Sequence, residues 1–255
     1  MEAKGKEWDG GKARDPLENL PAKPSKPIIT IVTFLWGRWY DRIGEYLEEL
    51  EKGFQKHTTF PLRFVCLAAD TTIPPFDRSW KWEFLPLKSP SKLGNLRKLG
   101  LYNPENNFQG RLLACDLDIM IVGSLDDILG YEGELLIKGK HQYAKENKRY
   151  APDGDLFLHN IRPDRWEKAW RWIRNHIQKI EARTKGQERS FYRRFGHQLW
   201  PALKIIQEEF PGQVRSFKKD KIRKTRKIPP DTRIISFHGK KVKPHMVDWL
   251  KGYGI

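Results

Sequence analysis

Two carboxylates that flank one apolar residue are the feature of this sequence best suited to chemistry. Asp116-Leu117-Asp118 directly follows the apolar run 111–115, which predicts a buried strand. Side chains alternate along an extended chain, so both carboxylates are expected on one side and Leu117 in the core. Unpaired carboxylates at such a position are costly, and hard oxygen ligands suit Mg²⁺ or Mn²⁺. We therefore predict that Asp116 and Asp118 hold a divalent cation that also binds a diphosphate.

A second set of suitable groups lies in the block 237–245, which reads FHGKKVKPH. The neutral imidazole of His238 can complete the coordination of a metal. Gly239 allows the backbone to approach a phosphate closely, and the Lys243 ammonium can neutralise it. Together with the two aspartates, this block predicts a site for a metal and a diphosphate.

A dense run of cationic residues precedes this block and is interrupted by one acid, Asp220. Such a run is usually a solvated face, but here it directly precedes the strand expected to carry His238. We therefore predict a polyanion-binding acceptor patch close to the active edge, extended by Arg193 and Arg194. Within the run, the patch comprises Lys218, Lys219, Lys221, Arg223 and Lys224.

The elements that must position these residues follow a strand–helix–strand order. The continuous apolar runs 28–35, 61–68 and 82–87 are typical of strands buried on both faces, and 40–54 has helical spacing. This order predicts an α/β fold, with a mixed, mostly parallel sheet flanked by helices. Open sheets of this kind bind ligands at the carboxyl ends of their strands, where Asp116 follows the run 111–115.

The remaining pattern indicates a single domain over 28–255, preceded by a flexible basic arm over 1–27. Tryptophans at helical spacing in the later part of the chain are assigned to the core. The further predicted elements are a strand at 119–122, a short helix capped by Ser124, one helix at 163–183, a helical stretch at 187–210 divided by Pro201, and a strand at 233–238.

Composition limits the class of protein and its partners. The chain has 255 residues, 48 Lys and Arg against 32 Asp and Glu, and a formal net charge of +16. This excess favours encounter with nucleic acid, anionic membranes or phosphorylated substrates, although a plain solvated surface is an equal alternative. Cys66 and Cys115 lie in apolar runs and are expected to be buried thiols. Because no segment approaches the roughly 18 apolar residues of a membrane span and no secretory signal is visible, we expect a cytoplasmic protein.

The two chemical blocks together resemble the GT-A-fold glycosyltransferases of the glycogenin and lipopolysaccharide-transferase type. The specific matches are Asp116-Leu117-Asp118 with the following segment 122–129, and the late His-Gly-x-x-x-Lys-Pro-His block. The resemblance implies that Asp116, Asp118 and His238 hold Mn²⁺ or Mg²⁺. It also implies that Asp116 lies near the donor ribose, Lys243 contacts the diphosphate and Gly239 allows close backbone approach.

Further positions follow from the same resemblance. The first strand is expected to meet the nucleotide base at Thr33, Phe34 and Trp36, and Lys98 matches a lysine near the donor. Gln187 matches the second member of a family Asp-Gln pair, whose first member is here Gly186. Where relatives carry an Asn-Ser-Gly-like turn on the acceptor side, this chain has Asp153-Gly154-Asp155. The candidates for catalysis are therefore Asp116, Asp118, Asp155 and Gln187.

Three functions remain open on the sequence. The first is a glycosyltransferase that moves a sugar from a nucleotide-sugar, UDP-glucose for example, to hydroxymethylated bases such as 5-hydroxymethylcytosine in DNA, as a viral DNA-modifying relative would. The second is transfer to a saccharide or lipid-linked glycan at a membrane surface, with the basic patch facing anionic lipid. The third is a basic nucleic-acid-binding module without catalysis. Donor sugar, stereochemistry and oligomeric state are not specified by any pattern here.

Overall fold

The computed structural model describes residues 26–37, 43–69, 81–140, 151–237 and 242–250. The predicted N-terminal arm falls almost entirely outside these residues, and so do His238 and Gly239.

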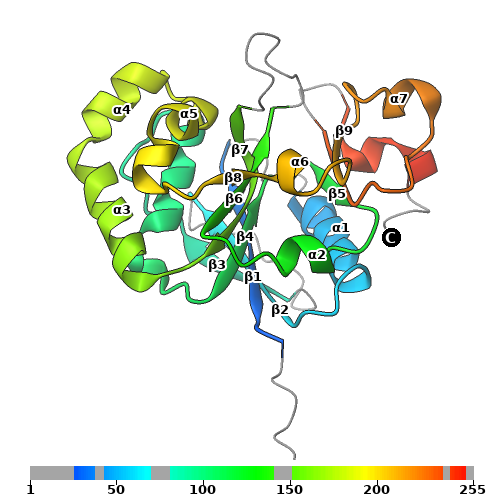
Figure 1. The fold of residues 1–255 in the computed structure, drawn as a ribbon, viewed down its shortest axis with the longest axis horizontal. Helices are drawn as coiled ribbons and strands as arrows, with labels where there is room; N and C mark the ends of the chain where they lie inside the picture. The colour runs from blue at the N-terminus through cyan, green and yellow to red at the C-terminus, as the bar shows by residue number, and fades with distance from the viewer. Residues whose placement is uncertain (1–25, 38–42, 70–80, 141–150, 238–241, 251–255) are drawn as a thin grey trace, which may run out of the picture.

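A seven-stranded mixed sheet forms the centre of the molecule (Figure 1). Its strand order is β3-β2-β1-β4-β7-β6-β8. The first four strands in this order pair in parallel, β4 and β6 each pair with β7 antiparallel, and β8 pairs in parallel with β6. The bounds are β1 Ile29–Leu35, β2 Leu62–Ala68, β3 Trp82–Pro86, β4 Arg111–Cys115, β6 Leu135–Gly139, β7 Pro152–Asn160 and β8 Lys204–Ile205. The predicted mostly parallel sheet flanked by helices is confirmed.

The alternation of β1 explains why its sequence is apolar apart from two buried threonines. All seven residues are buried, with Ile29 and Ile31 in the core on one face of the sheet and Val32 and Phe34 in the core on the other. Because both faces are covered, no position of this strand tolerates a solvated polar side chain.

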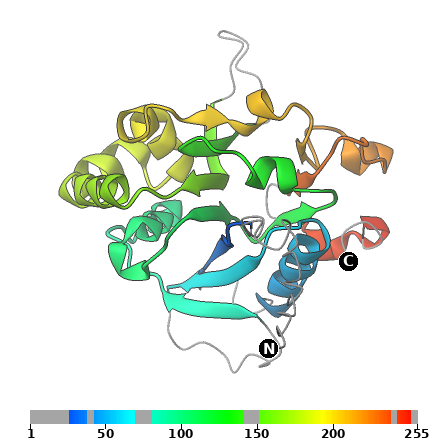
Figure 2. The same ribbon diagram turned by 60° about the horizontal axis from the view of Figure 1, so that its bottom comes forward.

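Helices cover both faces of the sheet (Figure 2). On the first face, α1 buries an apolar stripe that includes Tyr46, Leu47 and Phe54. On the second face, the 3₁₀ segment η2 and a group of helices share the core with Val65, Leu67 and Phe157. The bounds are α1 Ile43–Lys56 and α2 Asp126–Leu129 on the first face, and η2 Gly94–Tyr102, α3 Pro163–Asn175, α4 Ile177–Thr184 and α5 Glu188–Leu199 on the second.

A three-stranded sheet of order β5-β10-β9 lies beside the central one. Its strands are β5 Ile119–Ile121, β9 Val214–Ser216 and β10 Ile234–Ser236. Phe217 and Phe237 stack in its core at 4.5 Å between ring centroids. The helix α7 and the turns η4 and η5 pack around this core, with bounds Ile222–Thr225, Pro244–Met246 and Asp248–Leu250.

Several predicted elements differ from those observed. The single helix expected at 163–183 is divided at His176, where the backbone leaves helical geometry (φ −117°, ψ 14°). The stretch 187–210 is divided at Pro201 as predicted: its first helix ends at Leu199, because the residue before a proline is driven out of helical geometry. It continues as β8 and the short helix α6, Ile206–Glu209. Ser124 makes only a long 3.5 Å contact to the Asp126 amide and does not cap α2.

Two central strands, β6 and β7, were not predicted. The segment Asp153-Gly154-Asp155, expected as a turn, lies within β7 instead. Both strands carry charged residues at the end that faces the site, Lys138 on β6 and the two aspartates on β7, and this breaks the apolar pattern. None of the described helices is long and apolar enough to cross a membrane.

Candidate active site

Asp116 and Asp118 lie where β4 ends and the chain turns into β5. The side chain between them, Leu117, is 5% exposed and packs in the first-face core, as the alternation predicts. The Asp116 amide donates to the Asp155 carbonyl at 2.9 Å, and the Phe237 amide donates to the Asp118 carbonyl at 2.9 Å. Backbone bonds to β7 and to the end of β10 therefore fix both aspartates.

Two cavities meet at these aspartates. The smaller, about 210 Å³, is walled by the aromatic rings of Phe34 and Trp36. The larger, about 510 Å³, extends between β7 and the start of α5. Asn95, Lys98, Asp116 and Asp118 line both cavities and form the boundary between them. The larger cavity is also lined by Gly94, Asp153, Gly154, Asp155, Gly186, Gln187, Glu188, Arg189 and Phe237.

Lys98 connects three elements at this boundary. Its ammonium is buried, forms an ion pair with Asp116, and lies 2.7 Å from Glu188 Oε2 on α5. It also donates to the Gly154 carbonyl on β7 at 3.2 Å. Although burial alone would lower the pKa of Lys98, the charges of Asp116 and Glu188 raise it above its ordinary value. Lys98 is therefore a permanent cation at the junction of the two cavities.

The carboxylates around Lys98 are buried and lie close to other carboxylates. Burial, and then the charges of Asp118 and Asp155, raise the pKa of Asp116 to about 7, against the opposing effect of Lys98. Burial also raises the pKa of Glu188 well above its ordinary value. Glu188 Oε1 is buried and has no hydrogen-bond partner among the described residues.

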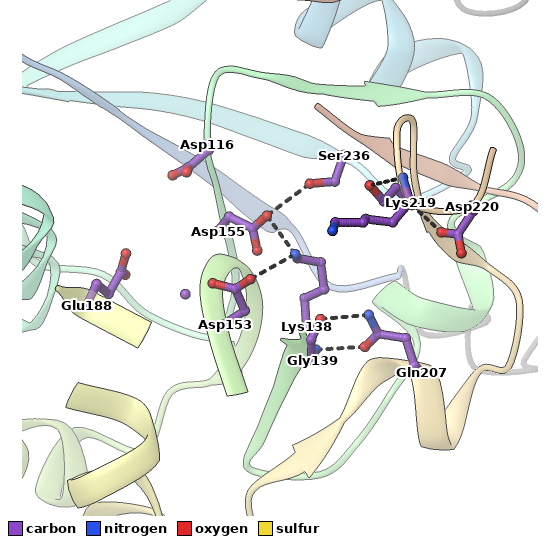
Figure 3. Close-up of polar contacts among 12 residues, drawn as sticks. Asp116, Lys138, Gly139, Asp153, Asp155, Glu188, Gln207, Lys219, Asp220 and Ser236 are labelled. Carbon is purple, nitrogen blue, oxygen red and sulfur yellow. Dashed lines mark hydrogen bonds and ion pairs between the residues drawn. The ribbon is translucent and has the colours of Figure 1, made fainter. Parts of the chain in front are cut away.

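A second buried lysine, Lys138, contacts the two aspartates of β7 (Figure 3). Lys138 is 0% exposed, and its Nζ lies 2.7 Å from Asp155 Oδ2 and 3.5 Å from Asp153 Oδ2. The hydroxyl of Ser236 on β10 donates to the same Asp155 oxygen at 2.9 Å. This network joins the central sheet to the small sheet directly beneath the larger cavity.

The charges at the site fit a divalent cation. Within the described residues, the ion pairs of the site join five carboxylates to three ammonium groups, and Arg189 also lines the larger cavity, which leaves a formal excess of one negative charge. Oxygen-rich surroundings of this charge suit Mg²⁺ or Mn²⁺. No three His, Cys, Asp or Glu side chains of the described segments converge as a complete metal site, and the predicted third ligand, His238, lies outside them. The ion pairs are made by Asp116, Asp118, Asp153, Asp155 and Glu188 with Lys98, Lys138 and Lys243.

The structure brings most of the predicted donor-side residues together. Phe34 and Trp36 line the smaller cavity, and the Lys243 ammonium forms an ion pair with Asp118. Gln187 reaches the larger cavity from the residue before α5. Thr33 is fully buried, and its hydroxyl donates to the Cys115 carbonyl at 3.0 Å. Thr33 is not one of the described residues that line the two cavities.

The predicted basic patch is not a single surface. Its members on the later segment are exposed around α7, and Arg193 and Arg194 are exposed on α5. Figures 1 and 2 place α5 and α7 at opposite ends of the molecule, with the central sheet between them. The expectation that these two arginines extend the same surface is therefore wrong. None of the predicted patch residues, all of them described, lines either cavity.

The residues of the site that received no role from the sequence include Asn95, Lys138, Asp153 and Glu188. Lys138 had a visible signal, because a lysine in the apolar run LLIKG requires a buried partner. Glu188 and Asp153 stand next to predicted site residues, but only the docking of α5 and the pairing of β7 turn them toward the cavity. Asn95 belongs to a 3₁₀ segment without a periodic pattern.

Comparison with known proteins supports the fold. No protein-family model matches the chain, and no curated protein does. Among solved structures, the galactosyltransferase LgtC, in complex with donor and acceptor sugar analogues, superposes with a TM-score of 0.54 at 12% identity, covering 84% of this chain and 88% of that one. An active-site mutant of LgtC gives a TM-score of 0.55 at 13% identity, covering 84% and 89%.

The glycosyltransferase GlyE of Streptococcus pneumoniae TIGR4 superposes with a TM-score of 0.51 at 14% identity. The match covers 89% of this chain and 60% of the GlyE chain. The protein thus has the GT-A architecture of these glycosyltransferases.

Proposed function

We propose that the protein is a glycosyltransferase that uses a nucleotide-sugar donor and a divalent cation. The observation that carries this proposal is the meeting of an aromatic-walled cavity and a larger polar cavity at Asp116 and Asp118. A nucleotide-sugar has the matching order of parts: a flat base, a diphosphate and a hydroxyl-rich ring. The shared fold with LgtC and GlyE supports the same reaction class.

The two cavities suggest how the donor is divided. The smaller cavity, which Phe34 and Trp36 line, suits the base of a uridine diphosphate sugar. Asp116 and Asp118, with His238, would hold Mn²⁺ or Mg²⁺, which supplies charge for the diphosphate as it leaves. Lys98 forms an ion pair with Asp116, and Lys243 forms one with Asp118. Gly239 would allow the backbone to approach the diphosphate.

The larger cavity suits the sugar and its acceptor. Carboxylates accept hydrogen bonds from hydroxyl groups, and the carboxylate of Glu188 belongs to a residue that lines this wall. The Gln187 amide can both donate and accept there. Asp155 lines the same wall, and Lys138 and Ser236 hold its side chain in place. We therefore favour a saccharide acceptor, either soluble or carried on a lipid at a membrane surface.

A polyanionic acceptor, such as DNA with hydroxymethylated bases, is the second candidate. The observation in its favour is the exposed basic run around α7, which adjoins the site through the pairing of β9 with β10. Ser216 on β9 lies in register with Ser236, the residue that contacts Asp155. Under this alternative, the backbone of DNA follows α7 while the modified base enters the larger cavity.

The proposal is tested first by ligand binding. Uridine diphosphate with Mn²⁺ should raise the melting temperature of the wild-type protein, because ligand at 100 times its Kd stabilises by about 2.7 kcal/mol. Asp118→Ala should lose this shift while melting normally without ligand. Asp127→Ala, a change at an exposed aspartate on α2, is the matched control and should keep it. A shift that is equal in all three proteins would contradict the metal assignment.

The reaction and acceptor are tested by mass spectrometry. The protein is incubated with Mn²⁺, a mixture of UDP-sugars, and either a panel of saccharides or hydroxymethylcytosine-containing DNA. A saccharide heavier by one sugar supports the favoured acceptor, and a nucleoside heavier by one sugar supports the second candidate. Absence of any product and of any released uridine diphosphate would leave a basic binding module as the better reading.

A further inference from the structure

The Lys138 ammonium is the most deeply buried charge in the described structure that has no assigned part in the reaction. We propose that Lys138 is a positioning residue that fixes Asp153 and Asp155 as an acceptor-binding wall and so determines acceptor affinity. This inference rests on the proposed glycosyltransferase function and names the part of the site that selects the acceptor.

The contacts of Lys138 show what it holds. Its side chain is fully buried in β6, with Nζ 2.7 Å from Asp155 Oδ2 and 3.5 Å from Asp153 Oδ2. Both aspartates line the larger cavity, whereas Lys138 does not. Lysine is rarely buried without a paired charge, and the pair must recover the cost of removing both groups from water. A lysine retained behind two cavity-lining carboxylates is therefore best explained by the geometry that it gives them.

The backbone around Lys138 is unusually well fixed. Pairing between β6 and β7 shifts register between Ile137 and Gly139, so that Lys138 lies in an irregularity of the ladder. The side-chain amide of Gln207 on α6 makes both backbone bonds to Gly139, accepting from its N–H at 2.7 Å and donating to its carbonyl at 2.9 Å (Figure 3). This clamp of two hydrogen bonds between Gln207 and Gly139 fixes the backbone next to Lys138, and therefore where the Lys138 ammonium contacts β7.

A third element holds the same carboxylate from the opposite side. The Ser236 hydroxyl donates to Asp155 Oδ2 at 2.9 Å, and Ser236 is itself buried in β10. Ser236 does not line the larger cavity. The orientation of Asp155 is thus set by two buried groups that a substrate in the cavity does not touch.

The position of this network points to the acceptor rather than the donor. Asp153 and Asp155 line the larger cavity but not the smaller, aromatic one. Lys98, in contrast, pairs with Asp116 and Glu188 at the boundary where the donor diphosphate is proposed to lie. None of Lys138, Asp153 and Asp155 lines the smaller cavity, which is proposed to hold the base of the donor. Oriented carboxylates accept hydrogen bonds from hydroxyls and repel anions, so this wall fits an uncharged, polyhydroxylated acceptor.

The test compares Lys138→Met, Ser236→Ala and the control Lys204→Met. Lys204 is an exposed lysine on β8, the strand next to β6. Four quantities are measured with Mn²⁺: the melting temperature, the affinity for uridine diphosphate, hydrolysis of UDP-galactose and UDP-glucose without acceptor, and transfer to a panel of methyl glycosides. Ser236→Ala removes one hydrogen bond and no charge, which keeps the test usable if Lys138→Met folds poorly.

The expected result is a selective loss on the acceptor side. The acceptor KM should rise about tenfold or more in Lys138→Met and about threefold to tenfold in Ser236→Ala, the range for one lost hydrogen bond to a charged group. Uridine diphosphate affinity and donor hydrolysis should stay within about twofold of the wild type in Ser236→Ala, and Lys204→Met should change nothing.

Other outcomes separate this inference from the function on which it rests. An unchanged acceptor KM in Ser236→Ala, or equal losses of donor hydrolysis and transfer, would overturn the positioning role. Wild-type protein that hydrolyses a UDP-sugar but transfers it to no methyl glycoside would retain the glycosyltransferase and reject this acceptor wall. Wild-type protein that neither binds uridine diphosphate nor hydrolyses a donor would reject both.

Discussion

The carboxyl group of Glu188 occupies the space that a side chain on Gly154 would need. A Cβ at residue 154 would lie 2.4 Å from Glu188 Cδ and 2.7 Å from its Oε1. Glycine at this position of β7 is therefore what allows α5 to present a carboxylate to the larger cavity. The Gly154 carbonyl simultaneously accepts from Lys98, so one residue sets both the backbone and the side-chain geometry of this wall.

Gly154→Ala should displace Glu188 and weaken its ion pair with Lys98. We expect a stability loss of about 1–3 kcal/mol, the usual cost of overpacking a buried site, together with a fall in donor turnover. Glu188→Ala removes the obstructing carboxyl, so Gly154→Ala should cost far less in that background. Urea unfolding of both single variants and the double variant measures this coupling, and strictly additive losses would contradict it.

His159 on β7 should make the fold sensitive to mild acid. It is buried against Trp166 and Trp200, its Nε2 lies 3.0 Å from the Tyr102 hydroxyl, and burial lowers its pKa to about 3. Below the unfolded pKa of about 6.5, the unfolded chain binds a proton that the folded protein excludes. The stabilisation that comes from keeping His159 neutral is complete above pH 6.5. It decreases as the pH falls, by about 2 kcal/mol at pH 5.

The variant His159→Gln isolates this contribution. Its stability should fall less than that of the wild type between pH 7 and pH 5, measured by urea unfolding at each pH. His197→Gln changes an exposed histidine on α5 and should follow the wild-type profile. A His159→Gln protein with the full wild-type pH dependence would show that other groups cause the acid sensitivity.

Reversing charges around α7 should weaken binding to duplex DNA without affecting the fold. Lys218 and Lys224 are exposed, and reversing both lowers the formal net charge from +16 to +12. Reversing Arg193 and Arg194 on α5 gives the same net charge at the opposite end of the molecule. We expect Lys218→Glu/Lys224→Glu to reduce the slope of log K against log salt by about 0.9 per lost phosphate contact. Equal losses in the two double variants, measured by fluorescence anisotropy, would indicate an effect of net charge alone.

The Gln207 amide should contribute substantially to stability although it lies outside both cavities. Gln207→Ala leaves the buried N–H and carbonyl of Gly139 without the two bonds at 2.7 and 2.9 Å. The expected loss is about 2–4 kcal/mol in urea unfolding, because each unsatisfied buried group costs about 1–3 kcal/mol. Gln198→Ala, at an exposed position of α5, should change stability by less than about 0.5 kcal/mol. A loss of the same size in both variants would remove the special role of the clamp.

The elements that the sequence predicted well are those whose burial is complete. The strands β1, β2 and β4 are apolar at nearly every position because helices cover both faces of the sheet, and such runs are recognisable without a structure. The site of Asp116 and Asp118 follows from the same logic, because two carboxylates after a buried strand must emerge at its carboxyl end. Both predictions could be made because they depend only on residues that are adjacent in the sequence.

Tertiary structure alone decided which charges meet. Asp116 pairs with Lys98 and Asp155 with Lys138, from elements whose proximity depends on the order of strands in the sheet. For the same reason, β6 and β7 could not be predicted from the sequence. Their charged residues are typical of loops, and only the folded structure places Lys138 opposite the β7 aspartates. A local pattern records which face of an element is buried, but the energy of an ion pair depends on distance and burial. These are properties that only the packing of distant segments supplies.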